Sequence, residues 1–343
     1  MKSLKFISII LTIVIILSSL PIISFGMGDG YADIVNHLGD AEASFLDGVG
    51  PEANGYALDY KYYSPVKDGD NTKYPLVIWL QGRGDNAEPG DQLEGSDIVA
   101  WATDEIQQRF TCSGGAFIFV PRAPKLFGWD NSLMDPLKAC IDDFIEKNKD
   151  NIDLTRIYLG GYSIGSWMSF KIAAVYPEMI AAIFVACPPW GMNNNTAKSL
   201  ADIPVWIVSS KNDFFVNHYT TVTPIWKKII SRSNVPENGR FSVLEKTAYP
   251  DGRISPDGHR SWHVLTYDGF SSQDSDYPLM STIDGNGDAI TLTYPDGVIS
   301  WLMSFTSDYD NSASDDDTSS TSVFSVLSHI ISKIVSYLKN IMR

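Results

Sequence analysis

The sequence predicts an α/β fold in which a mostly parallel central sheet is flanked by helices. From Tyr56 to the middle 300s, short β-rich runs alternate with longer helical patterns, as expected of strands joined by covering helices. Several short runs are continuously apolar, which is typical of strands buried on both faces. The predicted strands are 57–63, 75–80, 116–121, 156–159, 181–187, 205–209 and 241–245.

Helices are predicted between these strands at 136–148, 166–175 and 217–231, with a closing helix at 297–305. The segment 267–292 breaks the alternation with Gly, Asp, Ser and Pro, and we predict a turn-forming insertion there. Its run Asp284-Gly285-Asn286-Gly287-Asp288 resembles a calcium loop. It lacks the alternating oxygen ligands and the glutamate at the twelfth position that such a loop needs.

The composition describes a globular, acidic protein. The 343 residues are 44% hydrophobic and include 9 Trp, 16 Tyr and 16 Phe, enough apolar surface for a large core. With 41 acidic and 26 basic residues, the formal charge of −15 repels phosphate backbones. We therefore expect no nucleic-acid partner.

The first 26 residues have the layout of a signal peptide. A short basic segment, Met1 to Lys5, precedes an apolar run that ends before Pro21. Ser24 and Gly26 are small residues, suited to a cut after Gly26. The apolar stretch is also nearly long enough to remain in a bilayer as an uncleaved anchor. We expect cleavage, and hence a secreted catalytic domain over 27–306.

The C-terminal residues form two further segments. Residues 307–322 are Asp, Ser, Thr and Asn with almost nothing apolar, which predicts a linker. Residues 323–343 then place apolar side chains on one helical face and serines and lysines on the other. This tethered helix could contact an anionic membrane surface, pair with itself or another protein, or dock on its own domain.

The three cysteines, Cys112, Cys140 and Cys187, are too few for a disulfide scaffold, and their spacing matches no metal site. Cys187 ends an apolar run and is expected to be buried. A bridge between Cys112 and Cys140 is compatible with export but is not established by the sequence. None of the three is predicted to be catalytic.

The pentapeptide Gly161-Tyr162-Ser163-Ile164-Gly165 is the candidate for the chemistry. It lies between a predicted strand and a predicted helix, the context in which a serine sits on a sharp turn and is exposed as a nucleophile. Glycines at both flanks lack the side chains that would collide with neighbouring backbone. We predict that Ser163 is the nucleophile of a serine hydrolase.

The acid and the base should follow Ser163 in the chain. Asp213 lies directly after the strand 205–209, at the carboxyl end where such sheets assemble their sites, whereas Asp202 precedes that strand. We predict Asp213 as the acid.

Four histidines follow the serine. His329 belongs to the terminal segment, and His218 falls in a predicted helix close to Asp213. His259 lies in a turn-rich loop after the last predicted strand, and His263 is one helical turn further on. We predict His259 as the base.

Hydrolysis also needs donors for the oxyanion. One should be the N–H of Ile164, after the serine, and the other the N–H of Arg83 in the glycine-rich loop after the strand 75–80. Trp129 and Trp190 follow strand ends. We expect them either near the site mouth, where they would suit an aromatic acyl group or a sugar ring, or in core or rim packing. Trp262, in the histidine loop, is a third candidate contact. The mechanism requires neither a metal nor an organic cofactor.

Residues 56–306 resemble the secreted α/β-hydrolases that include polyhydroxybutyrate-depolymerase-like and feruloyl-esterase-like enzymes, dienelactone-hydrolase relatives and predicted peptidases. The resemblance is carried by the strand and oxyanion loop from Pro75 to Gly84, by the elbow around Ser163 and by Gly258-His259-Arg260-Ser261-Trp262. It implies an α/β-hydrolase fold and supports His259 over His263. Gln81 departs from the family, which usually has histidine there.

From these residues we expect an esterase that acts on a small ester or an acylated carbohydrate. A serine peptidase would use the same three residues, so the sequence leaves that alternative open. A second alternative is an inert hydrolase fold whose terminal helix binds a surface.

Overall fold

The computed structural model describes residues 37–84, 88–94, 97–247, 255–268, 280–292 and 297–309. The chain divides into two compact units, Met1–Ser307 and Asp308–Arg343. The predicted signal peptide, nearly all of the predicted linker and the helix predicted at 323–343 lie outside the described residues. Of the helices that are described, none combines the length and the apolarity needed to cross a bilayer.

The first unit is organised around a ten-stranded sheet with the order β1-β2-β4-β3-β5-β6-β7-β8-β9-β10. The six strands from β4 to β8 in this order run parallel, and β1, β2, β9 and β10 pair antiparallel at the two edges. The strands are β1 (Leu46–Val49), β2 (Asp59–Tyr63), β3 (Tyr74–Leu80), β4 (Phe117–Pro121), β5 (Ile152–Tyr162), β6 (Ala182–Ala186), β7 (Val205–Ser210), β8 (Arg240–Leu244), β9 (Met280–Ile283) and β10 (Ala289–Ile290).

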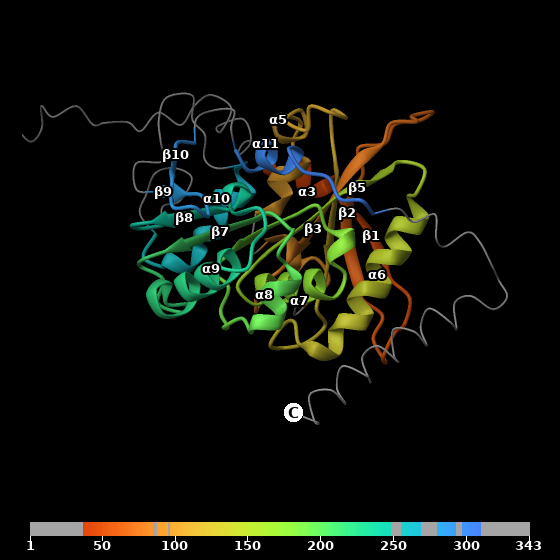
Figure 1. Ribbon diagram of the computed structural model, residues 1–343. Coiled ribbons are helices and arrows are strands. Elements are labelled where there is room, and N and C mark those ends of the chain that lie inside the picture. Colours follow the sequence, from red (N-terminus) through yellow and green to blue (C-terminus); the bar gives the residue numbers. More distant parts are fainter. Residues whose placement is uncertain are drawn as a thin grey trace, which may run out of the picture. The chain divides into compact units, whose positions relative to one another are not determined.

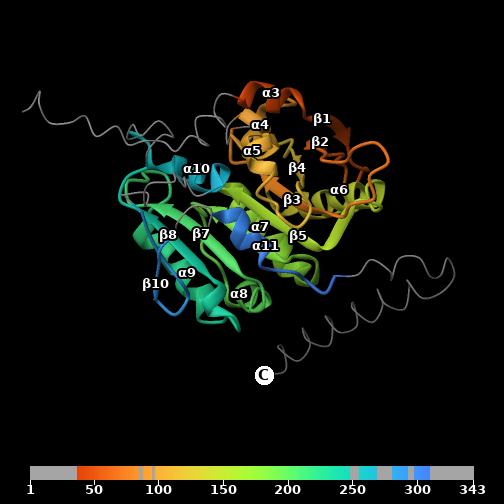
Figure 2. The same cartoon turned by 90° about the horizontal axis from the view of Figure 1, so that it is seen from above.

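Helices cover both faces of this sheet (Figures 1 and 2). One layer contains α6 (Met134–Lys147), α7 (Ile164–Val175), α8 (Asn194–Ser199) and α9 (Thr223–Ile230). The other face carries α3 (Leu38–Ala43), α5 (Asp104–Gln107) and α11 (Val298–Met303). The remaining helical segments are α4 (Asp91–Glu94), η1 (Ile98–Ala102), η2 (Asn131–Leu133), η3 (Pro177–Met179), η4 (His218–Val222), η5 (Pro236–Asn238), η6 (Gly258–Trp262) and α10 (His263–Thr266).

The continuously apolar runs predicted strands that are buried on both faces, and the central strands confirm this prediction. Every residue of β3, β4, β6 and β7 is buried. The spacing in α6 also behaves as expected, because Leu137, Cys140, Ile141 and Phe144 all face the core. Phe144 stacks on Phe119 of β4 with 4.3 Å between ring centroids, which fixes this helix against the sheet.

The segment 267–292, predicted as a turn-forming insertion, contains two strands, so that prediction was incomplete. β9 pairs antiparallel with β8, and β10 returns against β9 as a hairpin. Asp284 shapes the hairpin turn, since its Oδ1 accepts hydrogen bonds from the backbone N–H groups of Asn286 and Asp288. The pairing of β8 with β9 is partly polar, since Ser242 Oγ lies 2.8 Å from Thr282 Oγ1. The sequence of β9 therefore lacks the apolar periodicity by which a strand is recognised.

The cysteines are unpaired thiols in the structure. Cys112 is exposed, whereas Cys140 and Cys187 are buried. The bridge between Cys112 and Cys140 that the sequence left open is therefore not formed here.

Candidate active site

Ser163 lies on a sharp turn between β5 and α7. Its backbone has φ 51° and ψ −125°, a left-handed conformation that a residue with a side chain adopts at a cost. The turn is held because the Ser163 N–H donates to the Ala186 carbonyl of β6 at 3.0 Å and the Ser163 carbonyl accepts from the Ser166 N–H. The serine is thus presented at the carboxyl end of the central strand.

The two glycines of the pentapeptide are required by the close approach of α7 to β3. A Cβ at Gly161 would lie 2.7 Å from the Leu80 carbonyl oxygen, and a Cβ at Gly165 would overlap the same oxygen. Both contacts are with backbone, which cannot move aside. The motif is therefore explained by packing at this junction, in addition to the turn itself.

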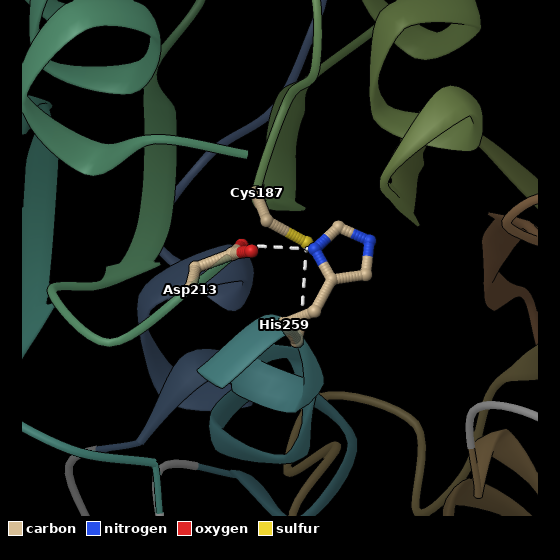
Figure 3. A group of neighbouring side chains, drawn as sticks. All are labelled: Cys187, Asp213 and His259. Atoms are coloured by element: carbon tan, nitrogen blue, oxygen red, sulfur yellow. Dashed lines mark hydrogen bonds and ion pairs between the residues drawn. The ribbon is translucent and has the colours of Figure 1, made fainter. Parts of the chain in front are cut away.

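Asp213 and His259 form a hydrogen-bonded pair, with 2.8 Å between Asp213 Oδ2 and His259 Nδ1 (Figure 3). Asp213 follows β7, and its second oxygen, Oδ1, accepts from the backbone N–H groups of Phe215 and Val216, each at 2.8 Å. These two bonds fix the carboxylate plane. Its Oδ2 is consequently aimed at the imidazole, as an orienting acid requires.

The loop that carries His259 is anchored to the loop that carries Asp213. The Asn212 side chain bonds to the backbone on both sides of the segment 248–254: its Oδ1 accepts from Thr247 N–H, and its Nδ2 donates to the Ser255 carbonyl. Thr247 Oγ1 donates to the Gly258 carbonyl at 2.9 Å. Asp257 Oδ1 then caps η6 by accepting from the His259 N–H. The histidine position is thus set by the acid loop.

The pKa of His259 is raised above its ordinary value of 6.5. Burial lowers this pKa, but the neighbouring Cys187 and the hydrogen-bonded Asp213 raise it by more. The positive form of the imidazole is therefore favoured, as is needed for a ring that must carry a proton during a reaction.

Tyr162, which precedes Ser163, and Trp262, in the histidine loop, are in contact. Tyr162 packs on Trp262 with 4.1 Å between ring centroids, and Trp262 meets the His259 ring edge-on at 5.8 Å. The hydrogen bonds of these described residues include none between the Ser163 side chain and the imidazole. Catalytic hydrogen bonds are often formed only when a substrate is bound.

The loop after β3 lies beside the start of α7. No hydrogen bond within the described residues engages the backbone N–H of Arg83 or of Ile164. Gly128 lies close to both, since a Cβ there would be 2.9 Å from Ile164 Cγ2 and 3.7 Å from Arg83 Cα. The two residues predicted to supply the oxyanion donors therefore lie close to one another.

Gln81, which stands where the family usually has histidine, is fully buried and ties this loop to the end of β4. In the amide orientation that satisfies both groups, its nitrogen donates to the Pro121 carbonyl at 3.0 Å and its oxygen accepts from the Ala123 N–H at 2.9 Å. Gln81 thus holds the loop that carries Arg83 against the end of β4.

The three tryptophans predicted as substrate contacts differ in placement. Trp129 is 1% exposed, and its Nε1 donates to the Gln81 carbonyl, so its indole supports the oxyanion loop from behind and does not reach a site mouth. Trp262 is also buried, against Tyr162. Trp190 alone is substantially exposed, at 53%, where it packs edge-on against Trp167 of α7.

Two exposed aromatic residues near the site were not singled out by the sequence. Phe215, 77% exposed, lies 5.4 Å from the His259 ring, and Phe127 lies 4.5 Å from the Arg83 guanidinium. Phe215 lies two residues after Asp213, and Phe127 lies two residues before Trp129. Their exposure depends on loop conformation, which no sequence pattern specifies.

The alternative acid and bases lie elsewhere. Asp202 accepts from the Asn234 amide at 2.7 Å, before β7 begins. His218 is buried with its Nδ1 2.9 Å from Ser209 Oγ, and burial lowers its pKa. His263 is buried at ion-pair distance, 3.2 Å, from Asp97. Of the histidines in the described residues, His259 is the one that meets Asp213.

This sheet order, with the serine after β5, the acid after β7 and the histidine after β8, is that of the α/β-hydrolase fold. Among solved structures, a thermostable esterase has a similar fold, with a TM-score of 0.56 and 22% identity over 78% of this chain. This chain spans 64% of the length of that esterase chain. A Bacteroides ovatus protein assigned as a dipeptidyl aminopeptidase IV gives a TM-score of 0.42 at 18% identity, covering 55% of this chain and 31% of that one. No protein-family model and no curated protein matches the sequence.

Proposed function

We propose that the protein is a serine hydrolase that cleaves carboxylic esters, with Ser163 as nucleophile, His259 as base and Asp213 as the orienting acid. The observation that carries this proposal is the 2.8 Å bond between Asp213 and His259 in a fold that holds Ser163 on a strained turn at the same sheet edge. Each of these residues occupies the place at which the fold assembles its chemistry.

The reaction begins when Ser163 Oγ attacks the ester carbonyl while His259 Nε2 takes its proton. Asp213 keeps the Nδ1 proton on the side away from the serine and stabilises the imidazolium that forms. The negative charge on the carbonyl oxygen is bound by the N–H groups of Arg83 and Ile164. Removing one such donor typically costs about 3 to 4 kcal/mol of transition-state stabilisation.

Collapse of the tetrahedral intermediate breaks the ester bond. The His259 Nε2 proton passes to the departing alkoxide, and an acyl-enzyme remains on Ser163. A water molecule then repeats the attack, with His259 again as base, and the carboxylic acid is released. All proton transfers use one imidazole that is supported by one carboxylate.

We propose an apolar or aromatic acyl or alcohol group for the substrate, either in a small ester or in an acylated carbohydrate. The support comes from the exposed aromatic side chains of Phe127, Phe215 and Trp190, which lie against Arg83, His259 and Trp167, respectively. Large exposed apolar side chains next to a candidate site are typical of binding surfaces.

The experiment is labelling of the purified protein with a fluorophosphonate probe, together with hydrolysis of p-nitrophenyl acetate. We expect both in the unmodified protein and neither in Ser163→Ala. Ser304→Ala, which removes an exposed hydroxyl at the end of α11, serves as the matched control and should retain both. Failure of the well-folded protein to react with the probe would contradict the proposal.

A panel of peptide and ester substrates separates ester from amide cleavage, because both reactions use the same residues. We expect turnover of acetyl and feruloyl esters. Cleavage of peptides without ester turnover would replace the esterase proposal by the peptidase alternative.

We also propose that the protein is exported and that its C-terminal residues attach it to a surface. The basis is the sequence of residues 1–26 and 323–343. Sequencing of the N-terminus of protein recovered from the culture medium tests export, and sedimentation with anionic vesicles tests the attachment.

A further inference from the structure

Cys187 lies beside the Asp213–His259 pair, although the proposed mechanism makes no use of its thiol (Figure 3). One ligand atom from each of Cys187, Asp213 and His259 lies within 4.8 Å of the others. A thiol, a carboxylate and an imidazole are together the set of ligands that zinc and cadmium prefer in proteins.

The backbone directs this thiol towards the pair. Cys187 directly follows β6, which lies between β5 and β7 in the sheet, so it lies between the strands that carry Ser163 and Asp213. Its φ of 42° is left-handed, and its Sγ lies 3.4 Å from the His259 carbonyl oxygen. A cysteine in this backbone conformation is unusual, because residues with a side chain seldom adopt it.

The other two ligands are already oriented. The Oδ1 atom of Asp213 is used by two backbone N–H groups, which leaves Oδ2 directed at His259 Nδ1. In a tetrahedral zinc site with metal–ligand bonds of 2.0 to 2.3 Å, ligand atoms stand roughly 3.3 to 3.8 Å apart. The Asp213 and His259 atoms are 2.8 Å apart and all three ligand atoms lie within 4.8 Å of one another, so small side-chain rotations would bring them to this spacing.

We propose that Cys187 Sγ, Asp213 Oδ2 and His259 Nδ1 form an inhibitory site for a thiophilic divalent cation of the Zn²⁺ or Cd²⁺ type. Water supplies the fourth ligand. The binding site itself follows from the three side chains, whereas the inhibition rests on the proposed hydrolase function.

Binding forms a metal–sulfur, a metal–nitrogen and a metal–oxygen bond. The Cys187 thiol proton leaves to solvent, and the His259 Nδ1 proton moves to Nε2, or leaves to solvent if Nε2 already carries one. An imidazole with metal on Nδ1 and a proton on Nε2 cannot accept the Ser163 proton. The metal also takes the Asp213 oxygen that would orient the ring, so hydrolysis stops.

The binding experiment uses the full chain with Cys112→Ser, because the exposed Cys112 thiol would bind metal independently. Cadmium is titrated into chelator-treated protein, and the thiolate-to-cadmium charge-transfer absorption in the ultraviolet is recorded. We expect saturation at one cadmium per chain and loss of the absorption in the further variant Cys187→Ser.

The matched control is Cys140→Ser on the same background. Cys140 is equally buried, but its Sγ lies near the Leu58 carbonyl at 3.8 Å, and burial together with the nearby Asp143 raises its pKa to about 12. This thiol should stay protonated. The Cys140→Ser variant should therefore keep the full absorption.

The inhibition experiment measures ester hydrolysis against free Zn²⁺. We expect Zn²⁺ inhibition, measured against each protein's own rate in the presence of a chelator, to weaken by at least about tenfold in Cys187→Ser. Cys187→Ala provides a second variant if the serine at this left-handed position lowers the melting temperature. Rescue of the inhibited enzyme by chelator should be complete.

The inference is overturned if the cadmium absorption persists in both Cys187 variants, or if no absorption forms in the parent protein. Equal inhibition of the parent and the variants by Zn²⁺ would also overturn it. The absorption measurement needs no catalysis. If the protein binds cadmium through Cys187 but hydrolyses no ester, the proposed function fails and the metal site stands.

Discussion

Gly258 of the histidine loop lies against the backbone of Asn212 in the acid loop, so closely that a Cβ on Gly258 would overlap the Asn212 carbonyl carbon. The residues that follow each of them, His259 and Asp213, are the hydrogen-bonded pair. The close approach of these two backbones is therefore what brings base and acid together. It explains why a glycine precedes the histidine.

Gly258→Ala should separate the two loops and lengthen the Asp213–His259 bond. We expect kcat for ester hydrolysis to fall by at least about 100-fold, because displacing a catalytic group by about 1 Å can lower the rate by that factor. Overpacking should lower the free energy of unfolding by about 1 to 3 kcal/mol. Gly39→Ala, at a position with no atom within 4 Å of the added Cβ, is the control and should keep kcat. An active Gly258→Ala enzyme would show that this contact does not position the pair.

Gln81→Leu should disturb the oxyanion loop, since it removes both hydrogen bonds to the end of β4. We expect kcat to fall with little change in KM, because the loop acts on the oxyanion that exists only in the transition state. The loss of buried hydrogen bonds should also cost about 1 to 3 kcal/mol of unfolding free energy.

Gln107→Leu is the matched control for this substitution. Gln107 is a second buried glutamine with two backbone partners, the Trp101 carbonyl and the Ala116 N–H. Its loss should cost similar stability without the fall in kcat. Equal effects of the two variants on kcat would assign the Gln81 effect to general destabilisation.

The rate should depend on the protonation of His259. Because a protonated imidazole cannot accept the Ser163 proton, kcat/KM should rise with pH as His259 loses its proton. Its raised pKa places the midpoint above the ordinary value of 6.5. The measurement is the pH profile of kcat/KM for an activated ester in a buffer that contains a chelator. Direct titration of the His259 ring by NMR in Ser163→Ala provides the second measurement, and a midpoint at or below 6.5 in both would contradict the prediction.

The contact between Asp97 and His263 should contribute to stability in a pH-dependent way. Burial raises the pKa of the Asp97 carboxyl, but His263, by hydrogen bonding and by charge, and Tyr267 lower it, and the net pKa is below the ordinary 3.8. A carboxyl whose pKa is lower in the folded state stabilises the fold above its unfolded pKa. This contribution is lost as the pH falls through the folded pKa.

Asp97→Asn should therefore reduce the unfolding free energy near neutral pH and have a smaller effect in acid. Urea unfolding at a series of pH values between 7 and about 3 measures this. Asp142→Asn removes a carboxylate from an exposed pair with Lys138 and should have little effect at any pH. If the difference in unfolding free energy between the unmodified protein and Asp97→Asn stays constant with pH, the Asp97 carboxylate does not stabilise the fold in this way.

The parts of the site that were predicted from sequence are those with a local signature. The pentapeptide around Ser163 stands between a strand and a helix, and Asp213 and His259 each follow a strand, so chain order placed all three at one edge of the sheet. β9 and β10 were missed because short, polar edge strands have no apolar periodicity. Of the two positions that the sequence left open for Trp129, the structure shows core packing, and Trp262 is also buried. An indole in a loop can turn into the core as readily as into solvent, and no local pattern decides between them.

The sequence by itself determined the alternation of strands and helices, the strained serine turn and the order of the candidate residues, because each depends on residues close together in the chain. Only the tertiary structure decided which distant residues meet. Gly258 packs against the backbone of Asn212, and the Gln81 side chain bonds to Pro121 and Ala123. Cys187 lies beside Asp213 and His259. These contacts join residues 26 or more positions apart. They depend on how neighbouring strands are ordered in the sheet and on single left-handed residues such as Cys187, which local patterns do not encode.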